Sequence, residues 1–237
     1  MEADSLNCSI LGPDAAPGTE EFDLFVKEVA KEMTIKTGQK CTAIRRAIVP
    51  NALLDAVGDA VSAQLDKMVI GDPANETVKM GALASLDQQQ EVRQRVAELS
   101  QYAVTVYGDT EQVEVVDGNQ KTGAFISPIL LRAKNALSCP EVHDIEAFGP
   151  VSTLMGYDSV EEAAQLANMG EGSLVGSIFG YDDEAVNALV INAASYHGRL
   201  VLINRDSAKQ SSGHGSPLPH LTHGGPGRAG GGEELGG

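Results

Sequence analysis

Aromatic residues and positive charge are both scarce in this 237-residue chain. Phe, Tyr and Trp together make up 4% of it and Trp is absent, so its core must be mostly aliphatic. Hydrophobic residues reach 42%, enough to bury such a core, which argues against a chain that is disordered throughout. Lys and Arg number only 17 against 33 Asp and Glu, a net charge of -16. Because phosphate binding relies on clustered Lys and Arg, this balance argues against nucleic acid as a partner.

Long apolar runs and paired cysteines are absent as well. No stretch approaches the ~20 consecutive apolar residues that span a bilayer, and no signal peptide is evident at the N-terminus. The cysteines Cys8, Cys41 and Cys139 are widely spaced, which indicates free thiols in a reducing cytoplasm. Neither they nor the five histidines have the spacing of metal ligands. We expect a cytoplasmic protein with no metal site and no membrane partner.

The chain alternates between helical and strand-like segments. Apolar residues recurring at helical spacing, with Thr19, Ser159 and Asp183 as candidate N-caps, predict helices over about 20–37, 51–65, 87–100, 160–169 and 184–196. Short apolar runs predict strands around Cys8 and over 46–50, 68–73, 103–107, 113–116, 124–131, 174–179 and 200–203. Such alternation is typical of an α/β fold with a mainly parallel sheet.

The composition changes at Asp206. From Ser211 to Gly237 the chain is dominated by Gly, Ser, Pro and His. A flexible tail is one interpretation of such a composition. The other is a loop whose glycines let the backbone approach a ligand or another domain closely. We place the domain boundary here, with a catalytic domain over 1–205 and a Gly-rich segment, expected to be flexible, over 206–237.

Cys41 has the local chemistry of a reactive thiol. It follows a helix that is expected to end near Gly38, and Lys40, Arg45 and Arg46 lie close to it in sequence. Positive charge and free backbone N–H groups stabilise the thiolate, which is the reactive form. The alternative is an inert, buried cysteine, the commoner fate of a cytosolic thiol. Local chemistry alone leaves both interpretations open.

Seven short stretches, in a fixed order along the chain, carry a family resemblance. They are Glu2-Ala-Asp-Ser, Gly38-Gln-Lys-Cys-Thr, the pair Gly71-Asp-Pro and Met80-Gly-Ala-Leu, Phe125-Ile-Ser-Pro-Ile-Leu, Glu146-Ala-Phe-Gly-Pro-Val and Gly198-Arg-Leu-Val-Leu-Ile-Asn. In types and order these stretches resemble the motifs of the aldehyde dehydrogenase superfamily. The resemblance covers nearly the whole chain and implies the three-layer α/β/α catalytic domain of that family.

The same resemblance implies roles for individual residues. Cys41 matches the nucleophile, whose thiolate attacks an aldehyde to give a thiohemiacetal and then a thioester. Glu2 matches the glutamate that activates water to hydrolyse the thioester. Glu146 matches the residue that holds the nicotinamide ribose, although by its sequence alone it could be a solvated surface charge. Phe148 matches the residue that packs near the nicotinamide ring, and Gln88 aligns with one that contacts the other ribose.

The stretches at both ends of the chain resemble one branch of the family in particular. These are the semialdehyde dehydrogenases of bacterial aromatic-acid breakdown, including the dehydrogenase part of the bifunctional ring-cleavage proteins of phenylacetate catabolism, in which a hydratase domain follows. The implied reaction is oxidation of an acyl-CoA semialdehyde to the acid with NADP or NAD, and the resemblance favours NADP.

The resemblance also implies an incomplete enzyme. The family's cofactor-binding domain stands upstream of the base, and no Gly-x-Gly-x-x-Gly turn follows a strand here. We therefore expect a catalytic-domain fragment that needs a cofactor domain as partner, is inactive alone and is a homo-oligomer when full length. The competing hypothesis is a non-catalytic interaction domain that kept the fold.

Overall fold

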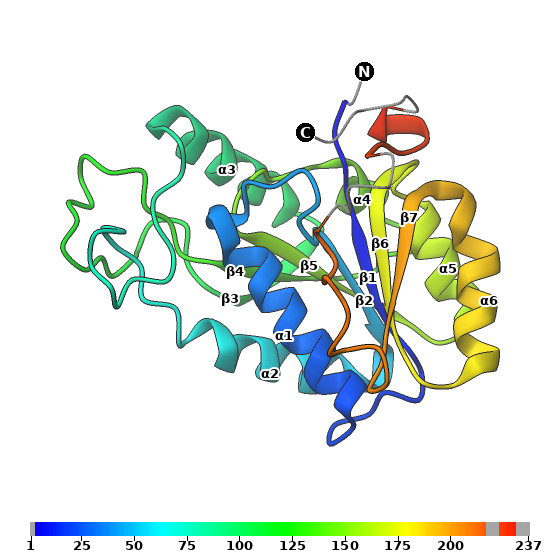
Figure 1. Ribbon diagram of the computed structural model, residues 1–237. Coiled ribbons are helices and arrows are strands. Elements are labelled where there is room, and N and C mark those ends of the chain that lie inside the picture. The colour runs from blue at the N-terminus through cyan, green and yellow to red at the C-terminus, as the bar shows by residue number, and fades with distance from the viewer. Residues whose placement is uncertain (1–2, 217–222, 231–237) are drawn as a thin grey trace.

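The computed structural model describes residues 3–216 and 223–230. A seven-stranded sheet with the order β3-β4-β5-β2-β1-β6-β7 runs through the molecule (Figure 1). In chain order the strands are β1 (Cys8–Leu11), β2 (Arg46–Pro50), β3 (Ala103–Tyr107), β4 (Ile129–Ala133), β5 (Val151–Tyr157), β6 (Ser173–Phe179) and β7 (His197–Ile203). All pairs are parallel except the antiparallel pair of β3 and β4 at one edge.

Helices cover both faces of the sheet, so the predicted mainly parallel three-layer α/β/α fold is confirmed. They are α1 (Glu20–Thr34), α2 (Leu54–Leu65), α3 (Leu86–Leu99), α4 (Glu141–Asp144), α5 (Val160–Asn168) and α6 (Asp183–Ala193), with 3-10 turns η1 (Ile35–Gly38), η2 (Asn51–Leu53), η3 (Ala194–Tyr196) and η4 (Gly227–Ala229). The first two α-helices lie on one face, in front of the sheet in Figure 1, and α3 to α6 lie on the other.

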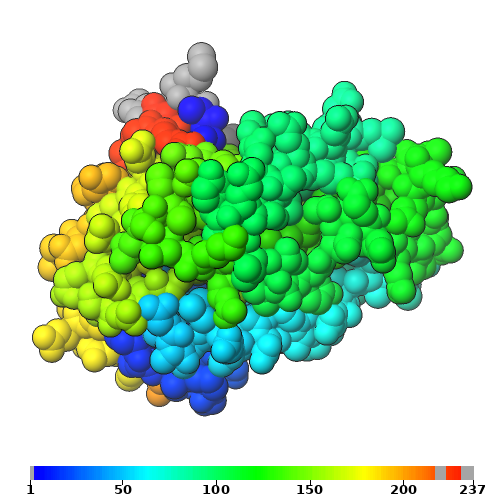
Figure 2. Space-filling model, turned by 180° about the vertical axis from the view of Figure 1, so that it is seen from behind, coloured from blue at the N-terminus to red at the C-terminus, as the bar shows by residue number. Residues whose placement is uncertain are grey.

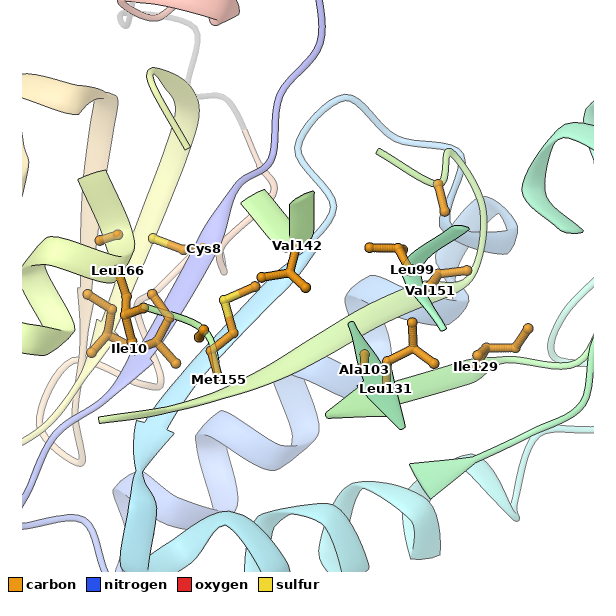
Figure 3. Close-up of a cluster of buried hydrophobic side chains, with 14 of the residues drawn as sticks. Cys8, Ile10, Leu99, Ala103, Ile129, Leu131, Val142, Val151, Met155 and Leu166 are labelled. Carbon is orange, nitrogen blue, oxygen red and sulfur yellow. The ribbon is translucent and has the colours of Figure 1, made fainter. Parts of the chain in front are cut away.

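Because side chains alternate along a strand, each strand contributes to two cores. Figure 3 shows the core behind the sheet, where Cys8 and Ile10 of β1 and Met155 of β5 pack with Val142 of α4 and Leu166 of α5. The alternate residues of the same strands face α1 and α2. Aromatic residues are few in both cores, as the composition requires.

Helix α1 starts at the N-cap that the sequence predicts, and it positions the segment that follows. Thr19 Oγ1 accepts a hydrogen bond from the Phe22 N–H at 3.3 Å, which caps the helix. Beyond the helix, Gly38 adopts a φ of +67°, and a Cβ added there would lie 2.1 Å from the Gly149 carbonyl oxygen. Only glycine combines this backbone conformation with this close approach. The backbone at Gly38, which leads into the Cys41 loop, therefore packs against Gly149 in the segment that precedes β5.

Several expected elements differ from the structure. The predicted strands over 68–73 and 113–116 are wrong. In place of strands there are isolated bridges, between Ile70 and Met80 and between Gly71 and Val116, because these stretches lie in loops beside the sheet. The strand expected over 124–131 begins only at Ile129, and α6 is capped by Asp182 rather than Asp183. Strand β5, which lies in the middle of the sheet, was not predicted. The loops over 66–85 and 108–128 project beyond the β3 edge (Figures 1 and 2).

The Gly-rich segment contacts the domain at several of its described residues. His214 is fully buried, its backbone N–H donates to Glu28 at 2.8 Å, and Arg228 forms ion pairs with Asp4 and Asp144. These contacts tie His214 to α1 and Arg228 to α4 and to the segment before β1. The flexibility expected for 206–237 stays a prediction. None of the helices in the described part is long and apolar enough to cross a membrane.

Candidate active site

The sequence-predicted site residues that the structure describes lie at one edge of the sheet, at the amino ends of its parallel strands. Cys41 and Arg45 immediately precede β2, and Glu146 and Phe148 immediately precede β5. Because parallel strands start at the same edge, loops that are about a hundred residues apart in sequence come together there. This edge is at the top of Figure 1, where β1 also begins. Glu2 lies outside the described residues, so its assignment as the base stays a prediction.

The Cys41 loop is fixed by hydrogen bonds to its backbone. The buried Asn7 side chain, just before β1, donates from Nδ2 to the carbonyl oxygens of Cys41 at 2.8 Å and Ala43 at 3.1 Å. Thr42 Oγ1 donates to the Gly215 carbonyl oxygen at 3.1 Å, which ties the loop to the Gly-rich segment. The thiol is therefore carried on a rigid loop, as precise chemistry requires.

Separate sequence motifs meet around this loop. Thr37 Oγ1 donates to the Gly81 carbonyl oxygen at 3.1 Å, and Gln39 Oε1 accepts from the Ala84 N–H at 2.9 Å. The backbone of Gly38 packs on Gly149. Motifs that matched the family one by one in the sequence thus form one connected shell in the structure.

The basic residues next to Cys41 in sequence have different partners. Lys40 is held 2.8 Å from the buried carboxylate of Glu32 on α1. Arg46 points away into the core, where it donates to the Leu166 and Ala167 carbonyl oxygens at the end of α5, at 2.7 and 2.9 Å. Arg46 is close to Cys41 in sequence, but its side chain points away from the thiol, because side chains alternate along the strand that it begins.

Arg45 links the thiol to Glu146. Its Nε lies 3.1 Å from Glu146 Oε1, and its other nitrogens donate to the carbonyl oxygens of Gly149 at 2.7 Å and Gly38 at 2.9 Å. The buried guanidinium also interacts electrostatically with Cys41. Burial raises the pKa of the Glu146 carboxyl, and the attraction of Arg45 opposes that rise. Glu146 is thus a half-buried carboxylate paired with Arg45 and not a solvated surface charge.

A pocket of about 580 Å³ opens beside Glu146, lined also by Phe148 and Gln88. Gln88 Nε2 donates to the Phe148 carbonyl oxygen at 3.2 Å, and the Arg45 guanidinium lies 5.3 Å from the centre of the Phe148 ring. The side chain of Glu146 keeps 13% of its surface exposed. A carboxylate that accepts hydrogen bonds, an aromatic face and an amide together fit a ribose and its attached ring.

Two side chains that sequence reasoning missed lie beside Cys41. The Nε2 atom of His223 is 3.6 Å from the Cys41 sulfur, and Arg199 of β7 places Nη1 3.4 Å from His223 Nδ1. They come 158 and 182 residues after the cysteine in sequence. The only available signal was indirect, since Arg199 stands inside the last family-like strand and His223 opens the glycine-rich stretch. Within the described residues, no group of three His, Cys, Asp or Glu could hold a metal.

Comparison with known proteins shows which family this sequence matches. A model of the aldehyde dehydrogenase family matches residues 14–235. The chain is 43% identical over 226 residues to 3,4-dehydroadipyl-CoA semialdehyde dehydrogenase of Aromatoleum evansii, which covers 95% of this chain and 44% of that protein. The chain belongs to the aldehyde dehydrogenase family. It is also 44% identical over 162 residues to protein MaoC of Klebsiella aerogenes, with 67% of this chain and 46% of that protein covered.

Solved structures of aldehyde dehydrogenases have the same fold. Betaine aldehyde dehydrogenase from Staphylococcus aureus superimposes with a TM-score of 0.80 at 23% identity, covering 97% of this chain and 42% of that one. Succinic semialdehyde dehydrogenase from Streptococcus pyogenes, in complex with NADP+, gives a TM-score of 0.78 at 23% identity, covering 97% and 45%. The present aldehyde dehydrogenase chain therefore spans less than half the length of the proteins it matches. The expected resemblance to acyl-CoA semialdehyde dehydrogenases is confirmed.

Proposed function

We propose that this chain carries the nucleophile and part of the nicotinamide site of an enzyme that oxidises an acyl-CoA semialdehyde to the carboxylic acid. The observation that supports this most is the arrangement around Arg45. One buried guanidinium interacts with the Cys41 thiol and binds the Glu146 carboxylate, which lines a pocket. A nucleophile and a ribose-binding carboxylate must sit side by side if an aldehyde is to be oxidised at the sulfur.

In the proposed mechanism the Cys41 thiolate attacks the aldehyde carbon and forms a thiohemiacetal. The backbone N–H of Cys41 is available to stabilise the developing oxyanion. A nicotinamide bound in the pocket would supply the acceptor for the hydride that leaves this carbon. The resulting thioester is then hydrolysed by a water molecule that Glu2 activates, which frees the thiol. Cys41 suits both halves of the reaction, because a thiolate is a soft nucleophile and a fair leaving group.

The residues described here fit the cofactor on their own chemistry. Glu146 would accept hydrogen bonds from ribose hydroxyls, Phe148 would pack near the ring, and Gln88 lines the same pocket. We propose NADP or NAD as the cofactor. NADP is favoured because of the resemblance to the semialdehyde dehydrogenase branch. The solved structures of similar fold include complexes with NAD+ and with NADP+ and do not distinguish the two.

The partner domain, oligomeric state and cellular compartment are also proposals. We propose that the chain acts together with a cofactor-binding domain, is inactive as an aldehyde dehydrogenase without one, and is a homo-oligomer when full length. Exposed apolar side chains on β7 and α6, such as Leu202 at 46% and Ile191 at 78% exposure, support self-association. Cys8, Cys41 and Cys139 form no disulfide, which supports a reducing compartment, for which we propose the cytoplasm.

The activity is testable with a hybrid enzyme in which this chain replaces the matched segment of the Aromatoleum evansii relative. We expect the hybrid to reduce NADP+ when given 3,4-dehydroadipyl-CoA semialdehyde, and the Cys41→Ala hybrid to bind NADP+ without reducing it. A hybrid that binds NADP+ and the substrate but shows no turnover would contradict the proposal and favour a non-catalytic domain. The chain alone is expected to show no reduction of the cofactor.

A further inference from the structure

A chain of contacts leads from β7 to the sulfur of Cys41. Arg199 Nη1 lies 3.4 Å from Nδ1 of His223, at the long end of hydrogen-bond distances, and His223 Nε2 lies 3.6 Å from Cys41 Sγ. The cysteine, histidine and arginine come from three parts of the chain: the loop before β2, the Gly-rich segment and the sheet itself.

Packing of the backbone holds the histidine in this place. A Cβ added to Gly198 would lie 1.7 Å from the Gly224 carbonyl oxygen, so the backbone after His223 lies directly against the start of β7. A Cβ on Gly225 would lie 2.4 Å from the Ser173 carbonyl oxygen of β6. Glycines at both positions therefore permit a close contact that larger residues would prevent. This contact sets His223 between Arg199 and the thiol.

Because arginine only donates hydrogen bonds, it determines which ring nitrogen of the neutral His223 carries the proton. A guanidinium can donate hydrogen bonds but cannot accept them. The Nδ1 atom that faces Arg199 must therefore be the unprotonated acceptor, and in the neutral ring the proton resides on Nε2. The Nε2–H faces the sulfur. In this tautomer His223 cannot take the proton of the Cys41 thiol, but it can donate a hydrogen bond to the thiolate.

Arg199 differs from the other cations near Cys41. Lys40 is paired with Glu32, and Arg45 is paired with Glu146. Arg199 interacts electrostatically with Cys41, and its buried Nε and Nη2 have no hydrogen-bond partner among the described residues. Arg199 also interacts electrostatically with Glu32, but it forms no ion pair with a carboxylate among the described residues. It therefore polarises the ring between it and the sulfur more strongly than a cation held in an ion pair would.

We infer that Arg199 is a positioning residue that fixes the tautomer of His223, so that His223 donates a hydrogen bond to the Cys41 thiolate. This inference rests on the proposed role of Cys41 as the nucleophile, and it assigns that nucleophile an activating partner. The thiolate is stabilised before the aldehyde arrives, and His223 contacts the reacting atom itself.

The test measures alkylation of the intact 237-residue chain by iodoacetamide at neutral pH, with each cysteine followed by mass mapping. We expect His223→Leu to slow the labelling of Cys41 about tenfold, because a hydrogen bond to a charged group is lost. His223→Gln, whose amide nitrogen can donate from a similar position, should remain within about threefold of the wild-type rate. A base at this position would lose its function in both variants, so rescue by Gln identifies a donor.

A double-mutant cycle tests whether Arg199 acts through His223. We expect Arg199→Met to slow labelling of Cys41 about fivefold in the wild-type background and less than about twofold in the His223→Leu background. The buried Cys8 is the internal control for folding, since it should stay unlabelled in every folded variant.

Three results would overturn the inference: an unchanged Cys41 rate in His223→Leu, equal losses in the Gln and Leu variants, or the same Arg199 effect in both backgrounds. Failure of the proposed function would look different, because Cys41 would then respond to His223 but accept no acyl group.

Discussion

The Nδ1 atom of His143 lies 3.0 Å from Nη1 of Arg46 inside the core. Because arginine only donates, this His143 Nδ1 must be an acceptor, and its Nε2–H donates to the Ala136 carbonyl oxygen at 2.9 Å. Both ring nitrogens are satisfied only while the ring is neutral. Burial, and then the charge of Arg46, lower the pKa of His143 from 6.5 to about 4.

This relationship predicts loss of stability in mild acid. Between about pH 6.5 and about pH 4 the unfolded chain takes up a proton at position 143 that the folded chain does not. The free energy of unfolding should therefore fall as the pH falls through this window, by up to about 3 kcal/mol from His143 alone. His214, whose pKa burial lowers to about 3, adds a loss of the same sign. Urea unfolding over this pH range measures the slope.

The control for this prediction is His143→Asn, which should flatten the slope. Glu21 does not interfere above about pH 4.5, because its hydrogen bond to Arg205 lowers the pKa of its carboxyl to about 2, and that stability is lost only below 4.5. His197 affects stability at higher pH. Burial lowers its pKa, but the interactions with Cys8 raise it by more, so the folded pKa lies above 6.5. The stability that His197 contributes is therefore lost as the pH rises above 6.5. An unchanged slope in His143→Asn would contradict the assignment.

Arg46 itself should be a large contributor to stability. It is fully buried and donates to the carbonyl oxygens of Leu6, Leu166 and Ala167. Arg46→Met keeps an apolar stem but removes a charged donor from each of these acceptors, and should lower the free energy of unfolding by about 3 kcal/mol. The matched control is Arg132→Met, which removes an ion pair of two exposed side chains and should cost under about 1 kcal/mol. Equal effects in chemical denaturation would contradict this account.

Most of the fold was predictable because the helix caps and apolar runs in the sequence form the elements that the packing requires. Thr19 and Ser159 cap their helices as predicted, each accepting a backbone N–H of the first turn, and the run from Arg46 to Pro50 is a strand. Strand β5 was missed because Val151–Tyr157 mixes Ser, Thr and Gly with its apolar residues, and only its central place in the sheet makes it a strand. The run over 113–116 has the residue types of a strand, but no neighbouring strand is available to pair with it.

The three cysteines should react at different rates. Cys41 is partly exposed on a loop near Arg45 and Arg199, whereas Cys8 is fully buried. We expect iodoacetamide to label Cys41 at least about tenfold faster than Cys139, and Cys8 only after unfolding. Mass mapping of a time course gives the three rates, and labelling in denaturant should make them similar. Equal rates in the folded chain would count against an activated Cys41.

Glu146 should affect binding of the cofactor. In the hybrid enzyme, Glu146→Gln weakens the acceptor offered to the ribose, and we expect the KM for NADP+ to rise about tenfold. Glu141→Gln is the matched control, since this nearby carboxylate does not line the pocket and should leave the KM unchanged. A normal KM in Glu146→Gln would remove Glu146 from the proposed cofactor site.

The site could be predicted only as far as its residues lie in recognisable motifs. Cys41, Glu146 and Phe148 stand in such motifs, and the structure brings their loops together. The roles assigned to them stay predictions. Arg199 and His223 could not be found, because their proximity to Cys41 depends on how the Gly-rich segment folds back onto β7. No local sequence pattern in the Gly-rich segment predicts that it packs against β7.

The most direct test of the central claim is acyl transfer to Cys41 from para-nitrophenyl acetate, which needs no nicotinamide. We expect the chain to release a burst of nitrophenolate equivalent to one acetyl group per chain, with the acetyl group mapped to Cys41. Glu2→Gln should retain the burst and slow the later steady release, because the thioester then lacks its base. A burst that persists in Cys41→Ala, or an acetyl group found on another residue, would contradict the assignment of Cys41 as the nucleophile.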